Sequence, residues 1–375
     1  MIKMKIYILE TNLPGEDVKS GGEERFTEGL SENLSRRHEV VVLTNGSKSS
    51  EKIGNLCIKR IGKMNVPVIK YVYRVLVLMR ELLKTENIDI IQSNISDTSN
   101  GIAGAVIKKI RGTKLITRVS GFGDPKDIGV FKRLIYRFIF RNSDVIVAIN
   151  SNFMVKDIKK LYNKSRVIVL PHGIDTEIRM KSKSYPRRKK FRLLFVGRLV
   201  YFKNVGMLLA SFKLLREKFD VSLDIIGNGP EERMLRKTAE DLGIKDNVNF
   251  LGEVSNEIVI DYMDKAHIFT FPSKREPRGL VLIEAMRSGL PVVAVNRGGP
   301  KDIIKPGRNG FLVEPEDAAG FSESVSRLLK DRNLYERISS NNVKDVYIFS
   351  WENVTKVWEN VYGSLLGKKY LSISL

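Results

Sequence analysis

Short apolar runs of strand length alternate with longer amphipathic segments along most of the chain. This alternation is typical of βαβ units, which form a parallel sheet covered by helices. In the first half, it predicts strands at Lys5–Leu9, Val40–Thr44, Ile88–Gln92, Leu115–Val119, Val145–Ile149 and Val167–Leu170. In the second half, it predicts strands at Arg192–Val196, Leu223–Ile226, Val248–Leu251, Ile268–Phe271, Val292–Val295 and Gly310–Val313. We therefore expect two doubly wound, Rossmann-like α/β domains that face each other across a cleft.

A polar and basic segment separates the two sets of strands. Residues 181–190 are rich in lysine and arginine and include a proline, which is typical of a linker. We expect a first domain of residues 1–178, a linker at 179–190 and a second domain of residues 191–350. Apolar residues recur at helical spacing in Trp351–Leu366, so we expect the C-terminal part, 351–375, to form a helix that packs back on the first domain.

Composition narrows the class of protein and its surroundings. The 64 Lys and Arg residues exceed the 43 Asp and Glu residues and leave a net charge of +21, which calls for an anionic partner. Nucleic acid is not expected, because no zinc-ligand motif or basic motif with stacking aromatics is found. The single cysteine, Cys57, cannot form an internal disulfide, which favours a cytoplasmic location. Its apolar neighbours predict that the side chain is buried. No apolar run approaches the roughly eighteen residues of a membrane span.

The segment 271–294 carries the strongest chemical signal. A predicted strand ends at its start, a loop holds Glu276, a helix opens near Gly279, and Gly289 ends that helix. The first backbone amides of such a helix are free to bind a phosphate. These amides belong to Gly279, Leu280 and Val281.

Two glutamates of this segment are the candidate functional carboxylates. Glu284 is followed by small and apolar residues, which is an unusual place for a solvated carboxylate. The structural alternative is that Glu276 caps the helix and that Glu284 merely lies on its face. The flanking residues favour the functional interpretation.

The segment resembles the group 1, or family 4, retaining glycosyltransferases of the GT-B type, whose signature is two glutamates separated by seven residues. The resemblance covers almost the whole chain and is strongest from Phe191 to Glu316. It implies transfer of a sugar from a nucleoside diphosphate sugar to an acceptor, with retention of configuration. In that family the first glutamate, here Glu276, contacts the donor sugar, and the second, here Glu284, holds the ribose hydroxyls. The sequence departs from the family pattern at Pro277-Arg278, so it does not predict which sugar is bound.

Two cations follow the first strand of the second domain. Arg198 and Lys203 lie just after Gly197, and by resemblance they bind the diphosphate of the donor. Fixed cations that meet the negative charge of a departing diphosphate lower the barrier to transfer. With such cations in place we expect no metal and no cofactor. The structural alternative is that they are two ordinary surface charges.

Two glycine-containing segments resemble further parts of the donor site. In 224–231 and 247–254, glycines such as Gly229 let the backbone approach the nucleotide, and main-chain atoms near Val254 read the base. Gly22 precedes the first helix and resembles the family's glycine loop, although a simple flexible turn is equally compatible.

The loop after Leu115–Val119 lacks the histidine that many relatives have there. Ser120 and Asp124 are the candidates to contact the sugar or the acceptor in its place. No enzyme base is required if the leaving phosphate oxygen accepts the acceptor's proton. Donor contacts are expected mainly in the second domain and acceptor contacts mainly in the first.

The segment Lys126–Arg141 combines cations with bulky apolar residues, and Tyr71–Lys84 is similar. A basic amphipathic helix of this kind is suited to an anionic membrane surface, here the inner face of the membrane. A half-buried domain helix explains the apolar face equally well. The acceptor remains open between a glycan, a lipid and a small molecule.

Two alternatives to a transferase stay open at this stage. One is a nucleotide-sugar epimerase of the same fold, which would consume donor without an acceptor. The other is a non-catalytic basic relative that binds membranes or nucleic acid. A dehydrogenase is disfavoured because Gly227–Pro230 lacks the later glycine of the dinucleotide fingerprint.

Overall fold

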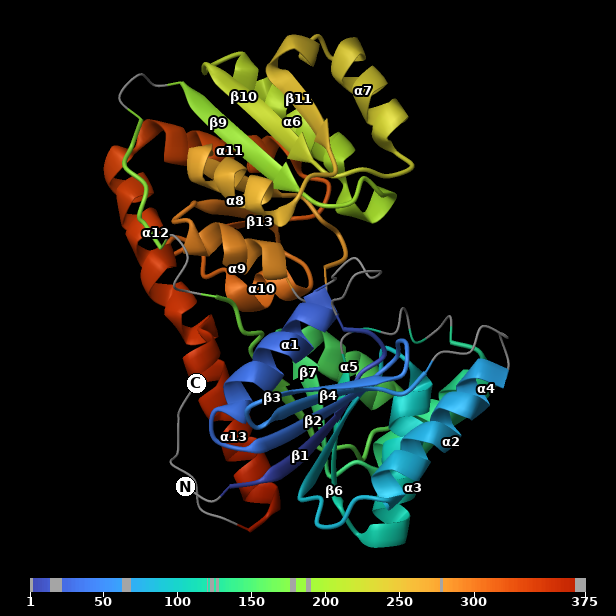
Figure 1. Ribbon diagram of the computed structural model, residues 1–375. Coiled ribbons are helices and arrows are strands. Elements are labelled where there is room, and N and C mark those ends of the chain that lie inside the picture. Colours follow the sequence, from blue (N-terminus) through green and yellow to red (C-terminus); the bar gives the residue numbers. More distant parts are fainter. Residues whose placement is uncertain are drawn as a thin grey trace. The chain divides into compact units, whose positions relative to one another are not determined.

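The computed structural model describes residues 3–13, 22–62, 69–119, 121, 125, 128–175, 180–186, 190–276 and 279–367. The chain divides into two compact units (Figure 1). The first unit comprises Met1–Gly173 with Ser350–Leu375, and the second comprises Ile174–Phe349.

The first unit is built around an eight-stranded sheet in the order β3-β4-β2-β1-β5-β6-β7-β8. The predicted strands are present as β1 (Lys5–Leu9), β2 (Glu39–Thr44), β5 (Ile90–Asn94), β6 (Lys114–Val119), β7 (Val145–Ile149) and β8 (Val167–Leu170). They are parallel to one another. The helices between them are α1 (Gly22–Ser35), α2 (Ile69–Leu83), α3 (Thr98–Arg111), α4 (Val130–Asn142) and α5 (Asn152–Leu161). Strands such as β1, β2 and β7 are mostly apolar and buried, as expected for a sheet with helices on both faces.

Two strands at one side of this sheet, the edge strand β3 and its neighbour β4, were not predicted. β3 (Ser49–Ile53) pairs antiparallel with β4 (Leu56–Arg60), which lies parallel to β2. Every residue of β3 is exposed, so it lacks the alternation of apolar and polar residues that identifies a half-buried strand. Cys57 lies in β4 and is only partly buried, and the prediction of a buried thiol was therefore wrong.

The C-terminal helix α13 (Trp351–Leu365) returns to the first unit, as predicted. Val354, Trp358 and Tyr362 recur every four residues and are fully buried in a core of the first unit. The Trp358 ring lies 5.9 Å from the ring of Phe26 in α1. The helix thus completes the apolar cover of one face of the sheet.

The predicted linker does not lie where the chain passes between the units. The described part of 179–190 belongs to the second unit. There Tyr185 packs edge-on against Phe191 and Tyr335, with ring centroids 5.4 and 5.6 Å apart. Lys183 Nζ donates to the Met263 carbonyl at 3.1 Å. The basic composition of the segment concealed these contacts, and the chain crosses at Gly173–Ile174 and Phe349–Ser350 instead.

The second unit has a six-stranded parallel sheet in the order β11-β10-β9-β12-β13-β14. Its strands are β9 (Phe191–Val196), β10 (Val221–Ile226), β11 (Val248–Gly252), β12 (Ile268–Phe271), β13 (Val292–Val295) and β14 (Gly310–Val313). The helices are α6 (Val205–Arg216), α7 (Glu232–Asp241), α8 (Asn256–Lys265), α9 (Leu280–Arg287), α10 (Gly299–Ile303), α11 (Ala318–Lys330) and α12 (Arg332–Asp345). The strand order reverses between β9 and β12, and ligands of doubly wound sheets bind at the carboxyl ends of the strands at such a switch point.

Candidate active site

Lys203 and Glu276 meet at the switch point of the second sheet. Lys203 ends the 3₁₀ turn Tyr201–Lys203 after β9, and Glu276 lies in the loop after β12. Lys203 Nζ donates to Glu276 Oε2 at 2.6 Å, and the two side chains are only 14% and 15% exposed. The structure thus brings together two residues that the sequence placed in separate motifs.

Glu276 is held in place from both ends. Its Oε1 accepts a hydrogen bond from the Gly279 amide at 3.1 Å, and its carbonyl accepts one from the Gly299 amide at 2.6 Å. A Cβ on Gly298 would lie 2.5 Å from that carbonyl oxygen, so a side chain there would displace Glu276. The prediction of a free Gly279 amide was wrong, because Glu276 occupies it as a cap of α9. Sequence reasoning missed the contribution of the Gly298-Gly299 pair.

Lys203 is also fixed by its surroundings. Its Nζ lies 5.0 Å from the centroid of the Phe271 ring, in the geometry of a cation–π contact. The loop after β12 is joined to the same 3₁₀ turn, because the Lys274 amide donates to the Phe202 carbonyl at 2.8 Å. The position of the Lys203 ammonium is therefore set by both loops that flank the switch point.

Arg198 and Glu284 are placed differently. Arg198 is exposed after β9, and its side chain makes no hydrogen bond or ion pair with the part of the chain that the structure describes. Glu284 lies on α9, where Leu280, Val281 and Glu284 form the half-buried face and their neighbours are buried. All three therefore share the face of α9 that the core leaves partly open.

Glycines bring the loops after β9, β10 and β11 close together. The Gly197 amide donates to the Ile226 carbonyl at 2.9 Å, and the Gly227 amide donates to the Gly252 carbonyl at 2.7 Å. A Cβ on Gly229 would lie 2.3 Å from the Leu199 carbonyl oxygen, so this position admits only glycine without a shift of the backbone. The half-buried Val254 follows two residues after Gly252.

The remaining predicted site residues lie in the first unit. Gly22 is the first residue of α1. Ser120 and Asp124 lie outside the described residues.

Each of the three histidines contacts other side chains or backbone groups of its own unit. His172 lies 4.8 Å from the Phe26 ring, and His38 Nε2 lies 3.1 Å from Glu359 Oε1. Burial lowers the pKa of His267 to about 4, and its Nδ1 accepts from the Arg192 amide.

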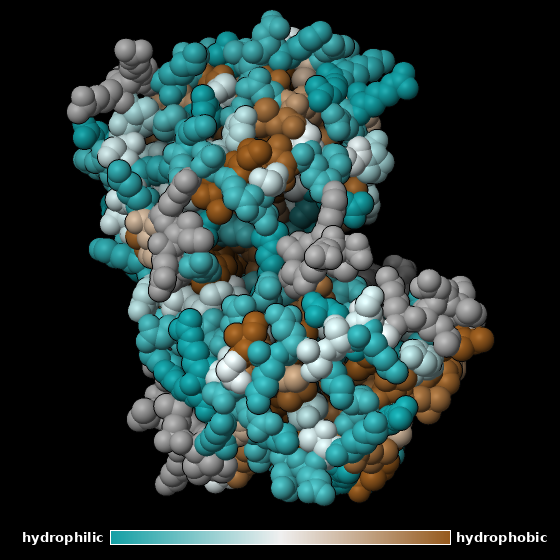
Figure 2. All heavy atoms as spheres, viewed as in Figure 1, coloured by the Kyte–Doolittle hydropathy of each residue, from teal (hydrophilic) through white to brown (hydrophobic). Residues whose placement is uncertain are grey.

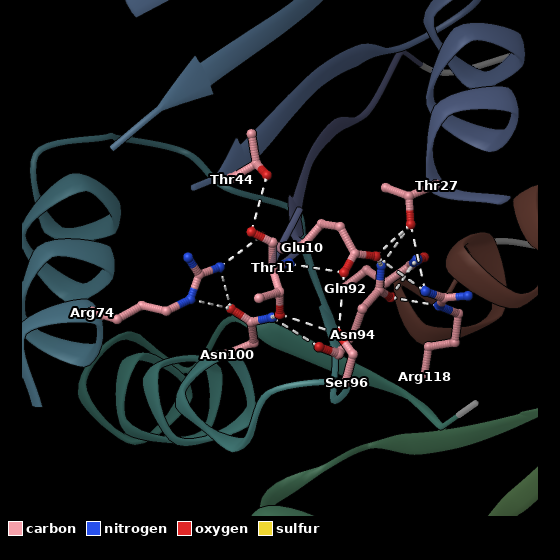
Figure 3. A network of polar contacts seen from close by, with 10 residues as sticks. All are labelled: Glu10, Thr11, Thr27, Thr44, Arg74, Gln92, Asn94, Ser96, Asn100 and Arg118. Atoms are coloured by element: carbon pink, nitrogen blue, oxygen red, sulfur yellow. Dashed lines mark hydrogen bonds and ion pairs between the residues drawn. The ribbon is translucent and has the colours of Figure 1, made fainter. Parts of the chain in front are cut away.

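A buried ion pair of the first unit was not singled out from the sequence. Glu10 follows β1 and Arg118 lies in β6; they are 2% and 1% exposed, and Arg118 Nη2 lies 3.1 Å from Glu10 Oε2 (Figure 3). The same carboxylate oxygen accepts from Thr27 Oγ1 at 2.6 Å and from Asn94 Nδ2 at 2.7 Å. Burial raises the pKa of Glu10, while the Arg118 charge and these hydrogen bonds oppose that rise. A charged residue inside a predicted strand, as at Arg118, was the available signal.

A second part of this network lies across β1 from the ion pair (Figure 3). Arg74 of α2 is buried and donates to Asn100 Oδ1 at 2.8 Å and to the Glu10 carbonyl at 2.6 Å. Asn100 in turn donates to Thr11 Oγ1 at 3.3 Å. Burial lowers the pKa of Arg74. The network thus joins α1, α2, α3 and three strands at the carboxyl edge of the sheet.

Within the residues that the structure describes, no three His, Cys, Asp or Glu side chains gather as metal ligands do. No described helix has the length and apolar character needed to span a bilayer.

Comparison with known proteins agrees with this geometry. The model of the family "Glycosyl transferases group 1" matches residues 176–345, and that of "Glycosyltransferase Family 4" matches residues 20–178. An uncharacterized glycosyltransferase of Methanocaldococcus jannaschii is 28% identical over 96% of this chain and 98% of its own. The N-acetyl-alpha-D-glucosaminyl L-malate synthase of Bacillus anthracis is 26% identical over 88% and 90%. HepE from Anabaena, solved in complex with UDP, superposes with a TM-score of 0.76 at 19% identity, over 96% of this chain and all of that one.

The two doubly wound units have the GT-B fold that the sequence resemblance predicted. The chain belongs to the group 1, or family 4, glycosyltransferases. It is a transferase, and these matches favour this activity over the epimerase and non-catalytic alternatives.

Proposed function

We propose that the protein transfers a sugar from a nucleoside diphosphate sugar to a hydroxyl of an acceptor, with retention of configuration and without a metal ion. The observation that carries the proposal is the Lys203–Glu276 pair at the switch point of the second sheet. HepE, which has the same fold, was solved with UDP and with UDP-glucose, which supports a nucleotide-sugar donor. The malate synthase is named for a product that contains an N-acetylglucosaminyl group, which supports the attachment of a sugar.

The roles of the residues follow from their chemistry. A lysine ammonium has three N–H donors, so Lys203 has the capacity to keep its bond to Glu276 and also meet a diphosphate oxygen. Arg198, which is exposed after the same strand, adds a second charge. These cations neutralise the departing diphosphate in place of a metal. The second oxygen of Glu276 is bonded to Gly279, so the carboxylate is oriented before a sugar hydroxyl arrives.

Retention is the outcome we propose for the acceptor step. The oxygen of the leaving diphosphate accepts the acceptor's proton on the face from which it departs, and the new bond forms on that same face. Lys203 and Arg198 stabilise the charge on the diphosphate until the proton has moved. No side-chain base is then required.

The two glutamates are expected to differ in their effects on nucleotide binding. Glu284→Gln should weaken the affinity for UDP or GDP about tenfold, because a hydrogen bond to a charged group is worth roughly 1.5–3 kcal/mol and glutamine retains only part of it. Glu276→Gln should leave the affinity for the free nucleoside diphosphate nearly unchanged and mainly slow sugar transfer. Titration calorimetry with UDP and GDP measures the first effect, and release of nucleoside diphosphate from the donor measures the second.

Glu323→Gln, on the exposed face of α11, is the matched control and should change neither quantity. Equal loss of UDP or GDP affinity in both active-site variants would show that the ribose and sugar roles are divided wrongly. Wild-type protein that binds neither nucleotide would defeat the proposed function itself.

We also propose that the protein works in the cytoplasm at the surface of an anionic membrane, docked through α4. Val130, Phe131 and Leu134 of this helix are 79%, 77% and 57% exposed. Figure 2 shows brown side chains at the right-hand margin of the first unit, where Figure 1 places both α2 and α4. The same helix carries Lys132, Arg133, Arg137 and Arg141. Exposed apolar side chains among cations suit a lipid interface.

Replacing these four cations by glutamine is expected to abolish most binding to anionic vesicles. Each cation near such a surface contributes roughly 1 kcal/mol, and binding of the wild type should weaken as salt screens the attraction. Co-sedimentation with vesicles of phosphatidylserine and phosphatidylcholine measures it. A variant with Lys213, Lys218, Lys245 and Lys344 replaced, all exposed in the second unit, carries the same change in charge and should bind like the wild type. Equal binding to neutral vesicles would contradict the proposal.

A further inference from the structure

The first sheet has a switch point of its own. Its strand order reverses between β1 and β5, which lie side by side. Glu10 and Thr11 follow β1 directly, and Ser96 follows β5. These residues therefore stand at the position where doubly wound sheets open a crevice for ligands.

Two hydroxyls bridge this switch point at the rim of the network in Figure 3. Thr11 Oγ1 and Ser96 Oγ lie 3.1 Å apart. Ser96 is exposed and Thr11 is half-buried, whereas the groups beneath them, Glu10 and Asn100, are buried. The two hydroxyls are thus the part of the network that a ligand in solution reaches.

The hydrogen bonds at the rim run in one direction. Asn100 Nδ2 donates to Thr11 Oγ1 at 3.3 Å, and Ser96 Oγ donates to Glu10 Oε1 at 3.2 Å. Since the Ser96 hydroxyl donates its hydrogen bond to Glu10, the hydrogen bond between Thr11 and Ser96 must be donated by the Thr11 hydroxyl. Each hydroxyl then uses its proton and one lone pair, and a second lone pair is left on each oxygen. The rim therefore presents two adjacent acceptors.

Glu10 sets this direction. An ionised carboxylate accepts hydrogen bonds and donates none, so the Ser96 proton must point toward it. Glu10 Oε1 also accepts from the Thr11 amide at 2.8 Å. Arg118 balances the charge of Glu10 and is itself fixed by Asn94 Oδ1 at 2.8 Å and by the Phe26 ring at 4.7 Å.

We infer that Thr11 and Ser96 accept hydrogen bonds from two neighbouring hydroxyls of a polyhydroxylated acceptor, a sugar or cyclitol ring, and that Glu10 is the positioning residue that orients them. The inference rests on the proposed function, since it assigns the substrate class of the acceptor step. A ring of this kind presents adjacent O–H donors, which matches two adjacent acceptor oxygens. An apolar ligand seated on the rim would bury both lone pairs without a donor, which is unfavourable.

The test uses the full chain with two probes, D-glucose and myo-inositol, in the presence of UDP or GDP. Saturation-transfer NMR should detect at least one probe with the wild type. Thr11→Val and Ser96→Ala should each weaken its binding at least fivefold, and Ser96→Thr should restore most of it. Ser49→Ala and Thr238→Val, both away from the network, should have no effect. Glu10→Gln should also weaken the binding of the probe, because the amide nitrogen of glutamine donates a hydrogen bond where the carboxylate accepted one.

Nucleotide affinity is measured in the same samples, which separates this inference from the proposed function. If only the proposed donor function is wrong, the protein does not bind UDP or GDP, but Thr11→Val and Ser96→Ala still weaken the binding of the probe. The inference is overturned if neither probe binds the wild type, or if the probe binds Thr11→Val and Ser96→Ala as tightly as the wild type. The rim variants keep the test decisive even if Glu10→Gln does not fold.

Discussion

Lys203→Ala is expected to slow sugar transfer on the order of 10²–10³-fold, the usual cost of removing one charge contact with a transition state. The loss should appear mainly in kcat, because negative charge on the diphosphate grows as the sugar leaves. Lys203 is only 14% exposed and bonded to Glu276, so its charge is less screened by solvent than that of a surface lysine. Arg198→Ala should slow transfer as well. Release of nucleoside diphosphate from the donor measures both effects.

The matched control is Lys245→Ala. Lys245 also pairs with a glutamate, Glu240, at 2.7 Å, but on the exposed surface of the same unit. Its loss should leave turnover unchanged. Circular dichroism and thermal unfolding should show that all three variants are folded. Near-normal turnover in both Lys203→Ala and Arg198→Ala would refute their assignment to the diphosphate.

Much of the second unit was predictable from local sequence. Each predicted strand is present, because buried parallel strands are continuous apolar runs that end at glycines or loops. Gly279 and Gly289 mark the ends of α9 and adopt φ angles of +64° and +69°, where glycine is favoured. The hydrogen bond between the Glu276 carboxylate and the Gly279 amide was predicted from the sequence only as the structural alternative. The conformation of the loop decides whether such a carboxylate caps the helix, and the local sequence does not reveal it.

The polar network of the first unit could not be predicted in the same way. Asn94 and Arg118 lie 84 and 108 residues from Glu10, with which they share hydrogen bonds. No local pattern links residues so far apart, and only the strand order brings β1, β5 and β6 together. The exposed strand β3 escaped prediction for a related reason, because its pairing with β4 and not its own apolar content makes it a strand.

Arg118→Leu is expected to lower the free energy of unfolding of the first unit by about 3–5 kcal/mol, because it leaves the buried Glu10 carboxylate without its counter-charge. Adding Glu10→Gln should recover much of this loss, since a buried ion pair replaced as a whole is often neutral in stability. Urea unfolding followed by tryptophan fluorescence reports on this unit alone. The chain has two tryptophans, and both lie in α13.

The loss in Arg118→Leu should also depend on pH. Burial already raises the pKa of Glu10 above its ordinary value of 4.5, and Arg118 opposes that rise. Without Arg118, the Glu10 carboxyl binds its proton more tightly in the folded variant than in the unfolded chain. The stability of the variant therefore falls as pH rises from 4.5 through the raised pKa of Glu10. The difference from the wild type should therefore be greater at pH 8 than at pH 5. A destabilisation that is the same at both values would mean that lost packing of the Arg118 side chain, and not the unpaired carboxylate, accounts for it.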